Sequence, residues 1–188
     1  IPDRKQNLTK YSKVLKSLVN GCKFLQKNKC KFISIPCNTA HHWYKDLKKE
    51  IKIPILNMPE IVYFNIKNNC KKNTKIGLLA TDATITVGVY SQYLDKKFNL
   101  ITPTKNLQIK SVNKSIRLVK MGKTKEAEKA IKPAVNYLIK KKCKKIILGC
   151  TELPIAIFAY KSFKKAKLSK KFLDPNLILA QASMKKYK

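Results

Sequence analysis

The sequence has few acidic residues and almost no arginine. Only 10 of its 188 residues are Asp or Glu, against 42 Lys and Arg, and the formal net charge is +32. Such a charge is typical of nucleic-acid-binding proteins. However, only Arg4 and Arg117 are arginines, and lysine lacks the bidentate fork on which sequence-specific readers rely. Because the lysines are spread along the whole chain, we expect no specific nucleic-acid partner and at most a loose attraction for polyanions.

Long apolar runs and glycine-rich loops are also absent from the sequence. No run approaches the ~20 apolar residues that a membrane-spanning helix needs, so we expect no membrane partner. Neither G-x-G-x-x-G nor a Walker loop occurs, which argues against a dinucleotide or a nucleoside triphosphate as ligand. Wholesale disorder is excluded, because 44% of the residues are hydrophobic and can bury a core.

Six cysteines lie at irregular spacings in this lysine-rich chain. Without secretory features, this pattern predicts reduced thiols in a cytoplasm-like compartment rather than a disulfide framework. The set Cys30, Cys37, His41 and His42 does not have the compact spacing of a structural zinc site. We therefore expect no metal.

Short apolar runs alternate with longer segments of helical period. The runs are 32–36, 53–56, 76–80, 98–102, 145–149 and a weak one at 171–173. Helices are expected at about 7–27, 40–50, 58–70, 84–96, 106–121, 124–141, 152–162 and 175–186. Continuous apolar runs indicate parallel strands that are buried on both faces. The alternation predicts an α/β fold with parallel sheets flanked by helices.

Two of the cysteines follow predicted strands directly. The strand at 32–36 leads into Cys37, and the strand at 145–149 leads into Cys150, each just before a helix. Open parallel sheets bind ligands at the carboxyl ends of their strands, and a helix N-terminus there is expected to lower the pKa of a thiol. Either cysteine alone is better explained as a buried core residue. The pair in matching positions predicts a site between two pseudo-symmetric lobes.

Several segments resemble the cofactor-independent aspartate/glutamate racemases, in the family's order and over essentially the whole chain. They are IPDR (1–4), PCNTAH (36–41), GLLATDAT (77–84), IRLVKMG (116–122), GCTEL (149–153) and LDP (173–175). PCNTAH and GCTEL together are specific, whereas the other segments would be weak alone. Glu152 resembles the aspartate-racemase branch, because glutamate racemases more often carry His after the Cys-Thr pair.

The resemblance implies an isomerase that interconverts L- and D-aspartate, or glutamate, without a cofactor. Cys37 and Cys150 would be its catalytic acid and base, one on each face of the α-carbon. Asn38, Thr39 and Thr151 would donate hydrogen bonds to the α-carboxylate and stabilise the carbanion. Capping of the helices is an equally good and compatible role for these three residues.

Four further residues are candidates for binding the substrate's carboxylates. Arg4 in IPDR and Lys120 in IRLVKMG would hold the side-chain carboxylate, for which an Arg fork is well suited. Lys120 depends on the family match alone, since about one position in five here is lysine. Thr81 and Thr84 match a substrate-binding loop of the family, although a turn and a helix cap would also explain them.

The expected organisation is a first lobe of residues 1–71 plus 173–188 and a second lobe of residues 72–172. The family usually has a strand and a glycine-rich turn before its first long helix, so we expect the first lobe to lack its N-terminal strand. The expected protein is a cytoplasmic homodimer whose small-molecule partner is an acidic amino acid. Two alternatives remain open: a truncated, inactive relative that acts as a basic binding protein, and a racemase for another amino acid or a hydantoin.

Overall fold

Strands and helices alternate along the chain, and each of the six apolar runs forms a strand. The computed structural model describes residues 13–158 and 166–187. The strands are β1 (Ile33–Ser34), β2 (Ile55–Leu56), β3 (Lys75–Ala80), β4 (Asn99–Ile101), β5 (Lys145–Gly149) and β6 (Phe172–Leu173). The helices are α1 (Lys13–Lys27), η1 (Thr39–Trp43, a 3₁₀ helix), α2 (Tyr44–Glu50), α3 (Met58–Asn69), α4 (Asp82–Thr86), α5 (Ser91–Leu94), α6 (Lys105–Leu107), η2 (Gln108–Asn113, a π-helix), α7 (Lys114–Lys120), α8 (Thr124–Lys140), α9 (Glu152–Phe158), α10 (Ala166–Ser169) and α11 (Pro175–Tyr187). The predicted α/β class is confirmed.

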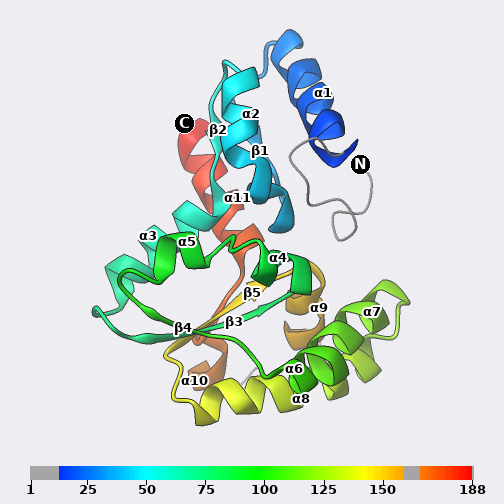
Figure 1. The fold of residues 1–188 in the computed structure, drawn as a ribbon, viewed down its shortest axis with the longest axis vertical. Helices are drawn as coiled ribbons and strands as arrows, with labels where there is room; N and C mark the ends of the chain where they lie inside the picture. The colour runs from blue at the N-terminus through cyan, green and yellow to red at the C-terminus, as the bar shows by residue number, and fades with distance from the viewer. Residues whose placement is uncertain (1–12, 159–165, 188) are drawn as a thin grey trace.

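All strands of the described residues are parallel and belong to two sheets. β1 pairs with β2, and the larger sheet has the order β4-β3-β5-β6. In Figure 1 the small sheet lies with α1 and α2 in the upper part of the molecule, and the larger sheet lies below it. α11 connects the two parts, because it packs along α3 and the Ser183 hydroxyl lies 2.7 Å from that of Ser34. The division into two lobes at the predicted residues stays a prediction.

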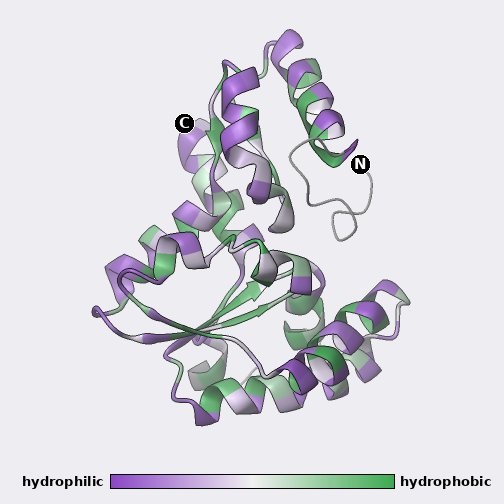
Figure 2. Cartoon of the chain, in the orientation of Figure 1, coloured by the Kyte–Doolittle hydropathy of each residue, from purple (hydrophilic) through white to green (hydrophobic). Residues whose placement is uncertain are grey.

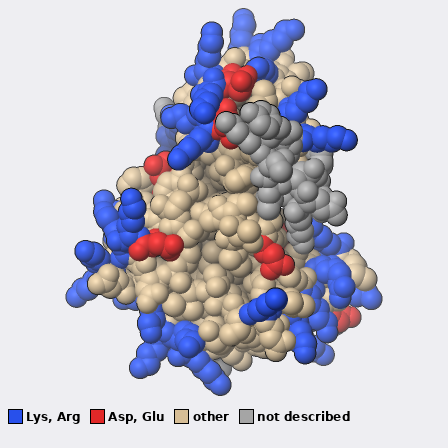
Figure 3. Space-filling view, in the orientation of Figure 1, with Lys and Arg blue, Asp and Glu red and all other residues tan. Residues whose placement is uncertain are grey.

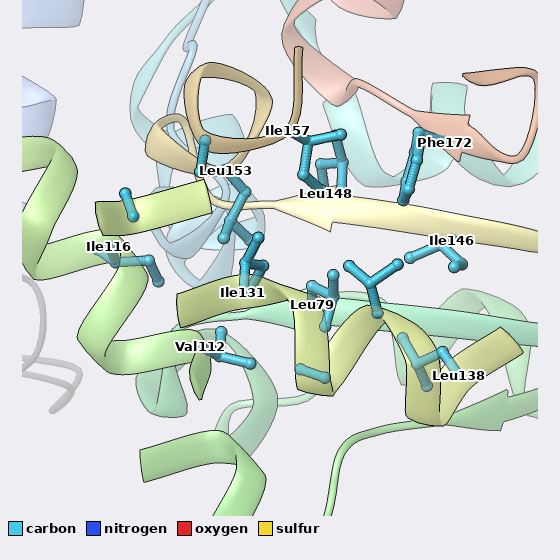
Figure 4. Close-up of a cluster of buried hydrophobic side chains, with 14 of the residues drawn as sticks. Leu79, Val112, Ile116, Ile131, Leu138, Ile146, Leu148, Leu153, Ile157 and Phe172 are labelled. Carbon is cyan, nitrogen blue, oxygen red and sulfur yellow. The ribbon is translucent and has the colours of Figure 1, made fainter. Parts of the chain in front are cut away.

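The larger sheet buries both of its faces, as its apolar strands require. Side chains alternate along a strand, so Ile76 and Leu78 of β3 pack against α3 and α5, while Leu79 packs against the opposite layer. That layer is formed by α7, α8 and α9, and its side chains interdigitate with β5 in Figure 4. Gly77 permits close packing there, because a Cβ atom on it would lie 2.9 Å from Cδ1 of Leu138.

The small sheet has a core of its own. α1, η1 and α2 bury Val14, Trp43 and Leu47 against β1, with at most 1% of each residue exposed. Figure 2 shows the corresponding pattern of hydrophobic strands and helices with hydrophilic outer faces. Within the described ranges, no helix combines the length and hydropathy needed to cross a membrane. All six cysteines are free thiols.

Three expected helices differ from the prediction within the described residues, and one of them, the segment 40–50, begins as the 3₁₀ helix η1. The segment 84–96 contains α4 and α5 with a break between them, because Gly88 adopts a left-handed φ of +65° that ends a helix at little cost for glycine. The segment 106–121 is helical, but its second turn is the π-helix η2. Helical periodicity does not distinguish an interrupted helix or a π turn from a regular helix.

Candidate functional site

A small cavity lies where β1, β3 and β5 end. Its volume is about 90 Å³, several times smaller than the pockets that hold drug-sized ligands, so its dimensions suit a small metabolite. The lining residues are Pro36, Cys37, Asn38 and Thr39 after β1, Thr81 after β3, Lys120 of α7, and Gly149, Cys150, Thr151 and Glu152 at the end of β5. Chain segments from both sheets therefore meet at one cavity.

Seven of the nine predicted site residues line this cavity: Cys37, Asn38, Thr39, Thr81, Lys120, Cys150 and Thr151. Thr84 does not line it but contacts two residues that do. Its hydroxyl lies 2.7 Å from that of Thr39 and 3.0 Å from that of Thr81. Thr81 also caps α4 by accepting a hydrogen bond from the Thr84 N–H. Arg4 lies outside the described residues.

His41 holds the peptide of Cys37 in place. Its Nε2 atom accepts a hydrogen bond of 3.1 Å from the backbone N–H of Met58, so the proton of the neutral ring is on Nδ1. Nδ1–H then donates to the carbonyl oxygen of Cys37 over 2.9 Å. Burial lowers the pKa of His41, more than hydrogen bonds to backbone groups raise it. The ring thus stays neutral and links η1 to the start of α3.

Cys150 donates its S–H to a carboxylate. The Sγ atom lies 2.9 Å from Oε2 of Glu152, and the Thr151 hydroxyl donates to the same oxygen over 2.9 Å. The other oxygen of Glu152 faces Nζ of Lys120 at 3.5 Å. Burial of Glu152 opposes its ionisation, but these hydrogen bonds and the charge of Lys120 outweigh burial and lower its pKa. Glu152 is therefore an anion that accepts hydrogen bonds from the Cys150 thiol and the Thr151 hydroxyl.

The expectation of a lowered thiol pKa is wrong for Cys150. Burial, followed by the hydrogen bond to Glu152 and its negative charge, raises the pKa of Cys150 to about 12. The hydrogen bond from the Glu152 backbone and the charge of Lys120 act in the opposite direction and are weaker. Cys150 is thus a protonated thiol at neutral pH, which suits a proton donor rather than a resting base.

Tyr90 belongs to the site without being predicted from the sequence: its hydroxyl donates to Oδ1 of Asn38 over 2.5 Å. Tyr90 lies between α4 and α5, 52 residues from Asn38. No local sequence pattern predicts a contact between residues so far apart in the chain. Glu152 also lines the cavity, whereas the sequence motif indicates only a resemblance to the aspartate-racemase branch. Its position could have indicated a role in the site. Acidic residues are rare in this chain, with 10 in all, and Glu152 stands two residues after a candidate catalytic cysteine.

A larger open groove of about 600 Å³ runs along η2 and α7. It shares Lys120 with the cavity, and Lys110, Lys114 and Arg117 add positive charge to its lining. The groove contains no thiol or carboxylate among its lining residues. The small cavity, with two thiols and a carboxylate, is consequently the candidate for chemistry, and the groove places further positive charge near Lys120.

Residues 1–183 match the Asp/Glu/Hydantoin racemase family. The chain belongs to this family. Its fold is similar to that of the solved aspartate racemase from Picrophilus torridus, with a TM-score of 0.81 and 30% identity over 99% of this chain and 75% of that one.

Two curated racemases are also similar in sequence. One is the broad specificity amino-acid racemase RacX of Bacillus subtilis, 26% identical over 143 residues, which are 76% of this chain and 61% of the relative. Another is the glutamate racemase of Carboxydothermus hydrogenoformans, 26% identical over 168 residues, which are 88% of this chain and 60% of the relative. This chain of the racemase family thus spans about three fifths of the length of these two relatives.

Proposed function

We propose that the chain carries the active site of a racemase that interconverts the enantiomers of an acidic amino acid, aspartate first, without a cofactor. The observation that carries the proposal is that Cys37 and Cys150, which follow strands of two different sheets, line one small cavity. Membership of the racemase family and the similarity to the Picrophilus torridus aspartate racemase support it.

The reaction needs one proton acceptor and one proton donor on opposite faces of the α-carbon. A thiolate at one cysteine takes the α-proton, and the thiol at the other cysteine delivers its own proton to the opposite face. The bond to one hydrogen breaks and the bond to another forms, so the product is the other enantiomer and the two sulfurs have exchanged protonation states. Each such acid–base group contributes ~10²–10⁴-fold to the rate.

Cys150 enters this cycle as the proton donor. Its S–H is hydrogen-bonded to Glu152, and its pKa of about 12 keeps it protonated. The opposing Cys37 then acts as the base towards the enantiomer whose α-hydrogen faces it. For the other enantiomer the roles are exchanged, and Cys150 must first lose its proton. Because the two enantiomers have equal free energy, kcat/KM is the same in both directions, and the raised pKa of Cys150 favours the form of the free enzyme in which Cys150 carries the proton.

The remaining polar groups of the cavity suit the two carboxylates of the substrate. The side-chain amide of Asn38, the hydroxyl of Thr39 and the backbone N–H of Thr151, whose hydroxyl donates to Glu152, would surround the α-carboxylate, on which negative charge accumulates when the α-proton leaves. Lys120 would pair with the side-chain carboxylate. In the described structure Lys120 faces Glu152 at 3.5 Å and its side chain is 58% exposed, so it can turn towards a second carboxylate at small cost. We also propose Arg4 for this carboxylate, from the family motif alone.

The test is chiral chromatography of L-aspartate and L-glutamate incubated with the protein. We expect D-aspartate to form, and neither Cys37→Ser nor Cys150→Ser to produce it, because a serine hydroxyl is far too weak an acid to replace a thiol. Cys70→Ser is the matched control, since Cys70 is half-buried but lies outside the cavity. Undiminished turnover in either cavity variant would refute the two-thiol mechanism.

A panel of neutral amino acids and a hydantoin in the same assay tests the second candidate, a broader racemase, which the similarity to RacX favours. A basic binding protein has less support as a candidate function. On the face of the molecule drawn in Figure 3, the Lys and Arg side chains lie mostly around the edge rather than in one patch. Salt-sensitive polyanion binding without any turnover would favour it.

A further inference from the structure

Only one of the two polar atoms in the side-chain amide of Asn38 has a hydrogen-bond partner among the described residues. Asn38 lines the cavity and is 3% exposed. Its Oδ1 atom accepts the hydrogen bond from Tyr90, whereas its buried Nδ2 atom has no hydrogen-bond partner within the described residues. Leaving a buried N–H unpaired costs ~1–3 kcal/mol. A donor kept in this state beside a cavity is suited to an acceptor that arrives with a ligand.

Tyr90 determines which end of the amide is left unpaired. The residue is 1% exposed and belongs to the core beside α5. Burial, followed by the negative charge of Asp174, holds the pKa of Tyr90 well above its usual range, so its hydroxyl is a neutral donor. If the amide were flipped, Nδ2 would face Tyr90 and the phenolic O–H would lose the acceptor that it has in Asn38. Oδ1 of Asn38 would then face the cavity, and this carbonyl oxygen would repel a carboxylate.

We infer that Tyr90 is a positioning residue that fixes the Asn38 amide with its N–H available to a carboxylate of the substrate. This inference rests on the proposed function, because it takes the ligand to be an amino acid. Tyr90 lines no part of the cavity itself, so its influence on the ligand passes through Asn38. Tyr90 lies two residues after Gly88, in the break between α4 and α5, and its side chain is buried in the core.

The experiment compares Tyr90→Phe with a control from the same region. Tyr93→Phe removes a hydroxyl that lies 2.6 Å from Nδ2 of Asn57, a residue outside the cavity. Both variants lose one Tyr–Asn hydrogen bond of similar length. We expect Tyr90→Phe to lower kcat/KM for aspartate by about tenfold or more and Tyr93→Phe to change it by less than about twofold. Equal effects in the two variants would overturn the inference.

A double-mutant cycle separates positioning from a general loss of structure. In an Asn38→Ala background, Tyr90→Phe should have no further effect on kcat/KM, because the amide that it positions is gone. Effects that multiply would show that Tyr90 acts independently of Asn38 and would contradict the inference. Melting curves of all variants verify that each is folded.

Calorimetric titration with L-aspartate measures binding without turnover, so it tests the inference independently of the proposed racemase activity. A parent that binds aspartate without racemising it would refute the function, while a Kd about tenfold weaker in Tyr90→Phe than in Tyr93→Phe would still support the inference. A parent that does not bind aspartate overturns both. If Tyr90→Phe does not fold, the NMR signals of the Asn38 side-chain amide, assigned through Asn38→Ala, are expected to shift when aspartate is added to the parent. Unshifted signals would overturn the inference.

Discussion

Replacing Glu152 with Gln should make the thiol of Cys150 more acidic. The pKa of Cys150 is raised from 9.0 to about 12, which corresponds to ~4 kcal/mol against the thiolate. Burial is the largest cause and is retained in the variant, because Gln has almost the same size as Glu. The negative charge of the acceptor at 2.9 Å is removed. We expect the pKa of Cys150 to fall by about one or more, and to stay above that of an exposed cysteine.

The rate at which iodoacetamide alkylates Cys150 measures this change, because the thiolate is the reacting form. Mass spectrometry of the peptide that contains Cys150, over a range of pH values, should show about tenfold faster alkylation in Glu152→Gln than in the parent. Cys70 in the same samples is the internal reference. Glu50→Gln is the matched control variant, since Glu50 pairs with Lys23 at the surface. If Cys150 reacts equally fast or more slowly in Glu152→Gln, the account of its environment is refuted.

Three further outcomes are expected from changes elsewhere in the chain. Lys120→Ala should raise KM for aspartate and lower kcat/KM by about tenfold, as steady-state kinetics will show; an unchanged kcat/KM would exclude Lys120 from binding the carboxylate. Because burial lowers the pKa of His41 in the folded chain, the unfolded chain binds the proton first, so the free energy of unfolding should fall by up to ~1.4 kcal/mol per pH unit as the pH drops below about 6.5. Urea titrations should find this dependence in the parent and not in His41→Asn. Leu138→Ala, at a core position with 0% exposure, should cost about 2–5 kcal/mol in the same titrations, and a loss below ~1 kcal/mol would contradict the packing of α8 on β3.

The fold class could be predicted because the central strands β3 and β5 are buried on both faces. Such strands appear in the sequence as continuous apolar runs, and even the weak run at 171–173 forms β6 at the edge of the larger sheet. The interruptions of helices could not be predicted in the same way. The interruptions depend on the φ angle of Gly88 and on the π turn of η2. Neither feature changes the hydropathy pattern of its segment, so neither is visible in the sequence.

The candidate site could be predicted only as far as its residues follow strands directly. Cys37 and Cys150 come after β1 and β5, and the carboxyl ends of these two strands, which belong to different sheets, lie at one cavity. The electrostatics of the site depend on contacts between separate segments. A helix N-terminus favours a thiolate, but at Cys150 burial and Glu152 outweigh that effect. The partnership of Tyr90 with Asn38 likewise arises from tertiary packing.

Racemisation of L-aspartate in D₂O tests the central claim, that two thiols act on opposite faces of the α-carbon. A thiol exchanges its hydrogen with the solvent, so the group that delivers the new proton delivers deuterium. At low conversion we expect the D-aspartate formed to carry deuterium at the α-carbon and the remaining L-aspartate to carry none. D-aspartate that retains its α-proton, or L-aspartate that is deuterated as fast as D-aspartate appears, would contradict the account.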